Sequence, residues 1–125
     1  GRAGRQAAGG QRLLLGEVLL HIQGGKTLAP AAREGLLRVL KTPKASYLPR
    51  LLPEDLEVAN KPGSLPGTRN DVGLFFIQGR PFVLAVMSDH LRDDLAMEEV
   101  IARMGRRAVQ TFQPAAAAPS PLQVP

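Results

Sequence analysis

The chain has no cysteine and no tryptophan, and among its 125 residues there are only one tyrosine, four phenylalanines and two histidines. Without cysteine there is no disulfide framework and no thiolate nucleophile. His21 and His90 are too few and too far apart in the sequence to indicate a clustered metal site. Aliphatic side chains must therefore supply nearly all of the buried surface, and neither a metal nor another cofactor is predicted.

Long hydrophobic runs are also lacking, since the longest falls far short of the ~20 apolar residues that cross a bilayer, so no membrane span is predicted. The net charge of +5 and the pI near 10.4 raise the possibility of nucleic-acid binding. The basic residues are dispersed, however, and no aromatic residues lie between them to stack on bases. Nucleic acid is therefore not predicted as a partner, and salt-dependent binding would be the sign that it is one.

Composition divides the chain into three parts. Residues 1–10 are rich in glycine, alanine and arginine and are expected to be a flexible segment, and residues 113–125 form a tail rich in proline and alanine that is expected to be disordered. Residues 11–112 remain for one folded domain.

The hydrophobic pattern predicts an α+β fold in which an antiparallel sheet packs against helices. Helices are predicted at residues 11–23, 31–40 and 92–112, strands at 56–60, 72–77 and 82–87, a loop at 42–53, and turns at 64–70 and 78–81. Gly24-Gly25 is expected to end the first helix, and Pro30 fits the first position of the second. In the last helix the buried stripe is expected at Met97, Ile101, Met104, Ala108 and Phe112, with Val100 and Val109 alongside.

The most informative stretch is Asn60-Lys61-Pro62-Gly63-Ser64-Leu65-Pro66-Gly67, which follows a short strand and precedes two apolar runs. Pro62 indicates that the continuation of the strand lies at a sheet edge or beside a cleft. Lys61 offers a positive charge to a substrate carboxylate or to a nearby nucleophile. Gly63 has no Cβ, so a flat ligand can lie close to the backbone.

These residues resemble the class A β-lactamases and related penicillin-recognising serine hydrolases over about residues 13–112. The likeness rests on the order of elements, on Val58-Ala59-Asn60-Lys61-Pro62-Gly63 as a variant of the Lys-Thr-Gly element, and on Gly67-x-Arg69-Asn70-Asp71-x-Gly73. It implies a hydrolase that acts on a β-lactam or a related amide or ester through an acyl-serine intermediate. Such an enzyme serves in β-lactam breakdown and antibiotic resistance, and the resemblance suggests an exported or periplasmic location.

The resemblance also assigns roles to residues. Lys61 is expected to be catalytic and substrate-binding, and the backbone N–H of Ser64 to be one of two oxyanion-hole donors. Pro62, Gly63 and Thr68 are expected to complete the substrate-binding wall. Pro62 departs from the family pattern, because it lacks both the hydroxyl of threonine and a backbone N–H, so carboxylate recognition is expected to fall to Lys61 alone or to Ser64 and Thr68.

The partner motifs Ser-x-x-Lys and Ser-Asp-Asn do not occur in the sequence. The chain is therefore interpreted as the incomplete, C-terminal part of the fold, inactive alone, whose partner is the N-terminal portion that carries the nucleophile. The alternative is a non-catalytic binding or structural module that keeps the fold. The sheet edge at residues 82–87 is expected to be unpaired, with Val83, Leu84 and Val86 exposed and prone to recruit other chains.

Other polar residues have simpler interpretations. Asp71 is expected to cap a turn or pair with Arg69. Ser88-Asp89-His90 is interpreted as a capping turn and not as a catalytic triad, because adjacent side chains point in different directions. His21 is expected to be a partly buried structural histidine.

Overall fold

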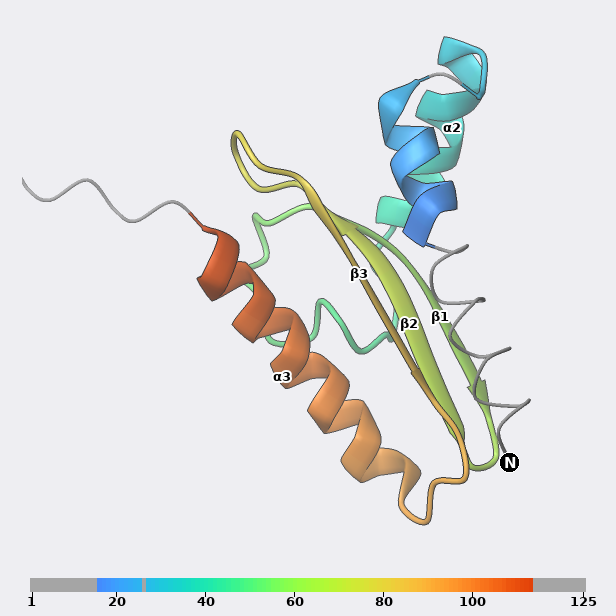
Figure 1. Ribbon diagram of the computed structural model, residues 1–125, viewed down its shortest axis with the longest axis vertical. Coiled ribbons are helices and arrows are strands. Elements are labelled where there is room, and N and C mark those ends of the chain that lie inside the picture. The colour runs from blue at the N-terminus through green and yellow to red at the C-terminus, as the bar shows by residue number, and fades with distance from the viewer. Residues whose placement is uncertain (1–15, 26, 114–125) are drawn as a thin grey trace, which may run out of the picture.

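The computed structural model describes residues 16–25 and 27–113. A helical segment at residues 16–24 is followed by α2 (Pro30–Lys41), β1 (Val58–Leu65), β2 (Thr68–Phe75), β3 (Phe82–Ser88) and α3 (Asp94–Phe112) (Figure 1). The strands form one antiparallel sheet in the order β1-β2-β3. The predicted α+β class is confirmed. Residues 1–10 and the tail from residue 114 lie outside the described part, as does the start of the first helix, so those predictions remain predictions.

The first hairpin of the sheet is longer than the sequence predicted. β1 continues through Pro62 to Leu65, and its turn is confined to Pro66-Gly67, so the predicted end of the strand at Asn60 is wrong. Gly67 has φ +74°, which suits the third position of a type II turn whose second position is proline. The second turn has the predicted position, with Gly79 at φ +75°.

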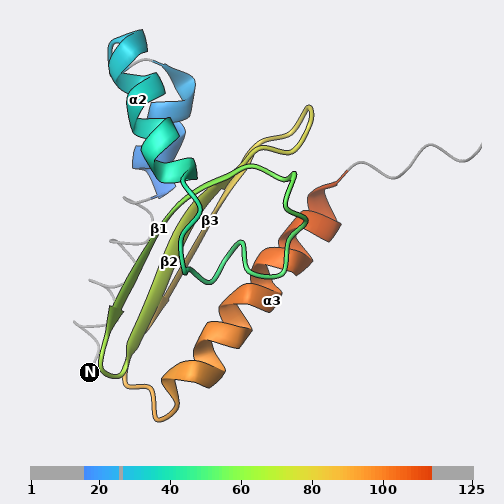
Figure 2. The same cartoon turned by 180° about the vertical axis from the view of Figure 1, so that it is seen from behind.

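Each face of the sheet carries its own hydrophobic cluster. On one face, Phe75 and Val58 pack with Leu48 of the 42–53 loop and Ile101 of α3. The other face carries the second cluster, which includes residues of the helical segment 16–24, of α2, of β1 and of β2: Leu19, Ile22, Leu37, Ala59, Val72 and Leu74. Figure 2 shows α3 running along one face of the sheet and α2 at one end of the strands, where it packs against β1. The central strand β2 is therefore covered on both faces, as its apolar run predicts.

Glycine at position 105 lets α3 approach the loop. Asp93 caps the helix by accepting a hydrogen bond from the N–H of Ala96 at 2.9 Å. The buried stripe contains Ile101, Ala102, Gly105 and Val109. The prediction is wrong at three positions, which are 45%, 41% and 36% exposed: Val100, Met104 and Phe112. A Cβ on Gly105 would lie only 2.3 Å from the carbonyl oxygen of Leu48. The buried face of α3 therefore includes Gly105, because the lack of a side chain there lets the helix approach the backbone of Leu48.

The two N-terminal helical segments are joined by one arginine. Gly25 ends the first helix with φ +68°, and Pro30 opens α2, both as predicted. Arg33 of α2 donates to the carbonyl oxygens of Ile22 at 2.6 Å and Gln23 at 2.8 Å. These bonds satisfy carbonyls that a helix end leaves without partners.

The outer edge of β3 is only partly as predicted. Among the described residues no strand pairs with its outer side. Val83 and Leu84 are partly buried, however, and Val86 is only 7% exposed because it belongs to the cluster beneath α3. The expectation that all these side chains are exposed is therefore wrong.

Candidate active-site wall along the edge of β1

The hydrogen-bond alternation of β1 decides which backbone groups reach its outer edge. Phe76 N donates to Glu57 O at 3.1 Å, one pair beyond the Val58–Phe75 pair. Hydrogen-bonded and non-bonded pairs alternate in an antiparallel ladder, so odd-numbered β1 residues bond to β2 and even-numbered ones point away from it. Pro62 and Ser64 both face outward. Pro62 therefore costs the ladder no hydrogen bond, and the N–H of Ser64 is directed to the outer edge.

The side chains predicted for the site divide between the two faces of the sheet. Lys61 and Gly63 share the face of Ala59 and α2, together with Thr68, which pairs directly with Leu65. The side chains of Pro62 and Ser64 lie on the opposite face, toward α3. Four of the predicted residues thus lie on β1 and Thr68 lies on β2, and their side chains do not share one surface.

The Lys61 ammonium lies at the same edge, because its Nζ donates to the carbonyl oxygen of Pro62 at 2.6 Å. The side chain is exposed. An added Cβ at Gly63 would lie 3.8 Å from the Cβ of Asn70, an ordinary contact. Internal packing therefore does not require glycine here, and its predicted role toward a ligand rests on the open side of the strand.

A buried polar network supports the strand just before Lys61. Asp71, 1% exposed, accepts hydrogen bonds from the N–H groups of Tyr47 at 3.2 Å and Leu48 at 2.9 Å. Asn60, 2% exposed, donates through Nδ2 to Asp71 Oδ1 at 3.0 Å and to Ser46 Oγ at 3.0 Å. Burial raises the pKa of Asp71 above its ordinary value of 3.8, against the opposing effect of these hydrogen bonds. The network attaches the 42–53 loop to the residue that precedes Lys61.

The sequence did not predict this network. Asp71 does not pair with Arg69, and that expectation was wrong because the two side chains find different partners. Asp71 lies directly opposite Pro62 in the register. The sequence shows only a carboxylate next to an apolar run, and this pattern does not indicate which groups donate hydrogen bonds to that carboxylate.

Arg69 instead holds the β1–β2 turn against the start of α3. Its Nε donates to Glu98 Oε1 at 2.7 Å, and its Nη1 lies 3.4 Å from Asp94 Oδ2. The same Nη1 donates to the carbonyl of Leu65 at 2.9 Å. The hydrogen bond from Arg69 holds the pKa of Glu98 below its ordinary value of 4.5. This cluster fixes the turn that follows Ser64.

Comparison with known proteins identifies the family of the chain. The model of the family described as "Beta-lactamase enzyme family" matches residues 14–112. The chain belongs to the β-lactamase enzyme family. No curated protein matches the chain.

Solved structures of class A β-lactamases and of a protein named PBP-A share the fold. A mutant of the class A β-lactamase of the last common ancestor of Gram-negative bacteria is 32% identical, with a TM-score of 0.71, covering 78% of this chain and 39% of that one. PBP-A is 28% identical, also with a TM-score of 0.71, over 78% of this chain and 38% of its own. A β-lactamase from Sphaerobacter thermophilus is 27% identical, with a TM-score of 0.66, over 74% and 36%. The chain thus spans about two fifths of the length of these structures.

For a β-lactamase family member, the other polar candidates are unsuited to catalysis. Ser88 Oγ donates its hydrogen bond to the carbonyl oxygen of Arg69 and not to His90. His90 Nδ1 lies 3.3 Å from Asp89 Oδ2, but both side chains are highly exposed. The triad reading is excluded, and the cap of α3 is Asp93, not this turn. Among the described residues, no group of three or more potential ligands could hold a metal ion, and no helix is long and apolar enough to cross a membrane.

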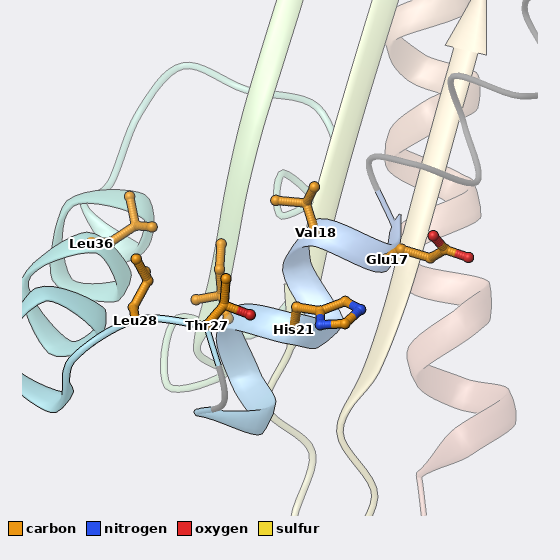
Figure 3. Close-up of a pocket in the computed structure, with 7 residues that line it drawn as sticks. Glu17, Val18, His21, Thr27, Leu28 and Leu36 are labelled. Carbon is orange, nitrogen blue, oxygen red and sulfur yellow. The ribbon is translucent and has the colours of Figure 1, made fainter.

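The cavities lined by described residues include one next to β1 and one between the N-terminal helical segments. The first, of about 820 Å³, is bounded by residues 41–60 and includes Lys44, Ser46 and Asn60 in its wall. The second, of about 420 Å³, is apolar and lies between residues 16–24 and α2, where Figure 3 shows Val18 and His21 across from Leu28 and Leu36. His21 is exposed beside this cavity, so the expectation that it is partly buried was wrong. Only the first cavity reaches the strand that carries Lys61.

Proposed function

We propose that this chain supplies one wall of a serine hydrolase site that acts on a β-lactam or a related acyl compound through an acyl-serine intermediate. The observation that carries the proposal is the outer edge of β1, where the Ser64 N–H and the Lys61 ammonium both lie. Membership of the β-lactamase enzyme family gives this arrangement its chemical meaning. One solved relative is described as an acyl-enzyme complex of PBP-A with penicillin G.

Each group has a distinct role in this proposal. The Ser64 N–H stabilises the oxyanion that develops when a serine attacks the substrate carbonyl, and a donor of this kind contributes a factor of about 10² to 10³ in rate. Lys61 supplies positive charge that attracts an anionic substrate and favours deprotonation of the nucleophile. The Ser64 N–H is held in place without substrate, since the backbone of β1 is fixed by the ladder to β2 and by the buried Asn60–Asp71 pair.

The nucleophile is proposed to come from a segment outside these 125 residues, because the sequence contains no Ser-x-x-Lys and no Ser-Asp-Asn. That segment is the proposed macromolecular partner of the chain. The upstream coding sequence provides a simple check, as the family spacing places Ser-x-x-Lys about 150 residues before Lys61.

Covalent labelling with a fluorescent penicillin tests the proposal. The chain alone is expected to remain unlabelled, whereas the chain joined to the segment with Ser-x-x-Lys becomes labelled at that serine. Lys61→Met should slow labelling, and Lys61→Arg should retain part of the rate because it keeps the charge. Labelling of the isolated 125-residue chain would show that the nucleophile had been wrongly placed.

Pro62 favours a second candidate, a binding or structural module without catalysis. The residue lacks the hydroxyl and the N–H of the family's threonine. If the joined protein binds penicillin G reversibly but is never acylated, the module is the correct description.

A further inference from the structure

The apolar cavity between residues 16–24 and α2, called the helix groove below, lies apart from the proposed active-site wall, since its lining residues all precede β1. Its volume is about 420 Å³, and its apolar lining consists of Val18, Ile22, Leu28 and Leu36. Figure 3 shows the carboxylate of Glu17 and the ring of His21 directed away from the leucines of the facing wall. Sites for small ligands orient them through a few polar groups placed inside the cavity. The helix groove therefore suits apolar side chains better than a small polar molecule.

One wall of the helix groove belongs to α2, which has more apolar surface than the sheet covers. Leu37 is buried against the sheet, whereas Leu36 and Val39 are 37% and 66% exposed. Glu34 and Arg38, four residues apart, form the charged side of the helix. Because a helix turns by about 100° per residue, Leu36 lies opposite that charged side. An apolar sector wider than its contact with the sheet indicates a second packing partner for α2.

The facing wall, formed by residues 16–24, has the same character. Val18 lines the groove and is 53% exposed, while Ile22, one turn further along, is buried. Arg33 joins this wall to α2 through its hydrogen bonds to the carbonyl oxygens of Ile22 and Gln23. The groove is therefore formed before anything binds to it. Two helices joined in this way present a furrow into which the side-chain ridge of a third helix fits.

We propose that the helix groove receives the apolar face of a helix from the segment that supplies the nucleophile. This inference rests on the proposed function, which places that segment outside these 125 residues. Solved relatives are long enough to contain it, because this chain covers only 39% and 38% of two of them, which leaves about three fifths of their length without a counterpart. The family match begins at residue 14. An upstream segment is thus connected to the described fold through residues 16–24, which form one wall of the groove.

Cysteine labelling tests the proposal, because the chain has no cysteine of its own. Leu36→Cys and the control Arg38→Cys are each made in the 125-residue chain and in the protein joined to its upstream segment, whose own cysteines are replaced by serine. The rate of reaction with an iodoacetamide dye is then compared between the two forms of each variant. Leu36→Cys should react about tenfold more slowly in the joined protein, since a covered side chain is reached only through local opening. Arg38→Cys lies on the charged side of the same helix and should react equally fast in both forms.

The possible outcomes distinguish docking in the groove from other effects. Equal reactivity of Leu36→Cys in the two forms would overturn the proposal, and Val18→Cys repeats the measurement from the facing wall. Equal slowing of Leu36→Cys and Arg38→Cys would also overturn it, because it would show general compaction. Slowing within the 125-residue chain that grows with its concentration would assign the groove to a second copy instead.

Fluorescent penicillin labelling of the same joined variants separates this inference from the proposed function. A joined protein that is acylated while Leu36→Cys stays reactive would refute docking in the groove and leave the proposed function standing. Protection of Leu36→Cys without acylation would retain the docking and reject the proposed function.

Discussion

Replacing Gly105 by alanine should destabilise the protein although alanine is the better helix former. A Cβ at this position would lie 2.3 Å from the carbonyl oxygen of Leu48, and real Cβ contacts essentially never fall under 3.0 Å. The helix or the loop would have to shift by about 0.7 Å. The loop is poorly able to move, because the N–H of Leu48 donates to buried Asp71 at 2.9 Å.

The magnitude follows from two opposing effects. Overpacking costs about 1–3 kcal/mol, and the upper end applies where the obstacle is constrained backbone. Exchange of glycine for alanine within a helix returns about 1 kcal/mol. The expected net loss in the free energy of unfolding is about 2 kcal/mol, which lowers Tm by roughly 10 °C for a domain of this size.

The matched control is Gly35→Ala in α2, where no heavy atom lies within 4 Å of the added Cβ. It should raise the free energy of unfolding by about 0.5–1 kcal/mol. Urea unfolding followed by circular dichroism measures both variants. If Gly105→Ala were as stable as the wild type, or if both variants changed in the same direction, the close packing of the 42–53 loop on α3 would be refuted.

Three further predictions concern charge and the sheet edge. Because burial raises the pKa of Asp71 above 3.8, the stability linked to this group is fully present below pH 3.8 and is lost as the pH rises through the raised pKa. Asp71→Asn should remove this pH dependence from the free energy of urea unfolding. An unchanged pH dependence in the variant would contradict the assignment to Asp71. Arg69→Met should return the pKa of Glu98 toward 4.5 in a carboxyl NMR titration, so that the stability gained above pH 4.5 and lost as pH falls through the lowered pKa disappears with it. The chain alone should self-associate through β3, and Ala85→Pro should weaken this in sedimentation velocity, since the alternation of the ladder directs the Ala85 N–H outward; a wild-type chain that stays monomeric at high concentration would argue against it.

The sequence predicted the elements better than their limits. Gly25, Pro30 and the turn at residues 78–81 carry local backbone requirements, so each was located correctly. Pro62 correctly indicated a sheet edge, because proline is tolerated on edge strands, but the end of the strand was predicted too early. At a non-bonded position on an edge it removes nothing from the ladder, and this depends on register, which the sequence does not display.

The site was only partly predictable for the same kind of reason. Lys61 and Ser64 lie in a recognisable motif, so the strand edge could be found from the sequence. The buried network of Asn60 and Asp71 depends on how the 42–53 loop packs against β1 and β2. Those contacts join residues 11 to 24 positions apart, and no local pattern encodes them.

The most direct test of the account is the rate of nitrocefin hydrolysis by the joined enzyme carrying Ser64→Pro, compared with Ser64→Ala. Proline removes the outward N–H at a position where the ladder loses no bond, as Pro62 already shows two residues earlier. Alanine removes the hydroxyl and keeps the N–H. The account predicts a fall in kcat of about 10² to 10³ for the proline variant and a nearly unchanged kcat for the alanine variant. A folded proline variant that turns over at the wild-type rate would contradict the claim that the edge of β1 supplies the oxyanion donor.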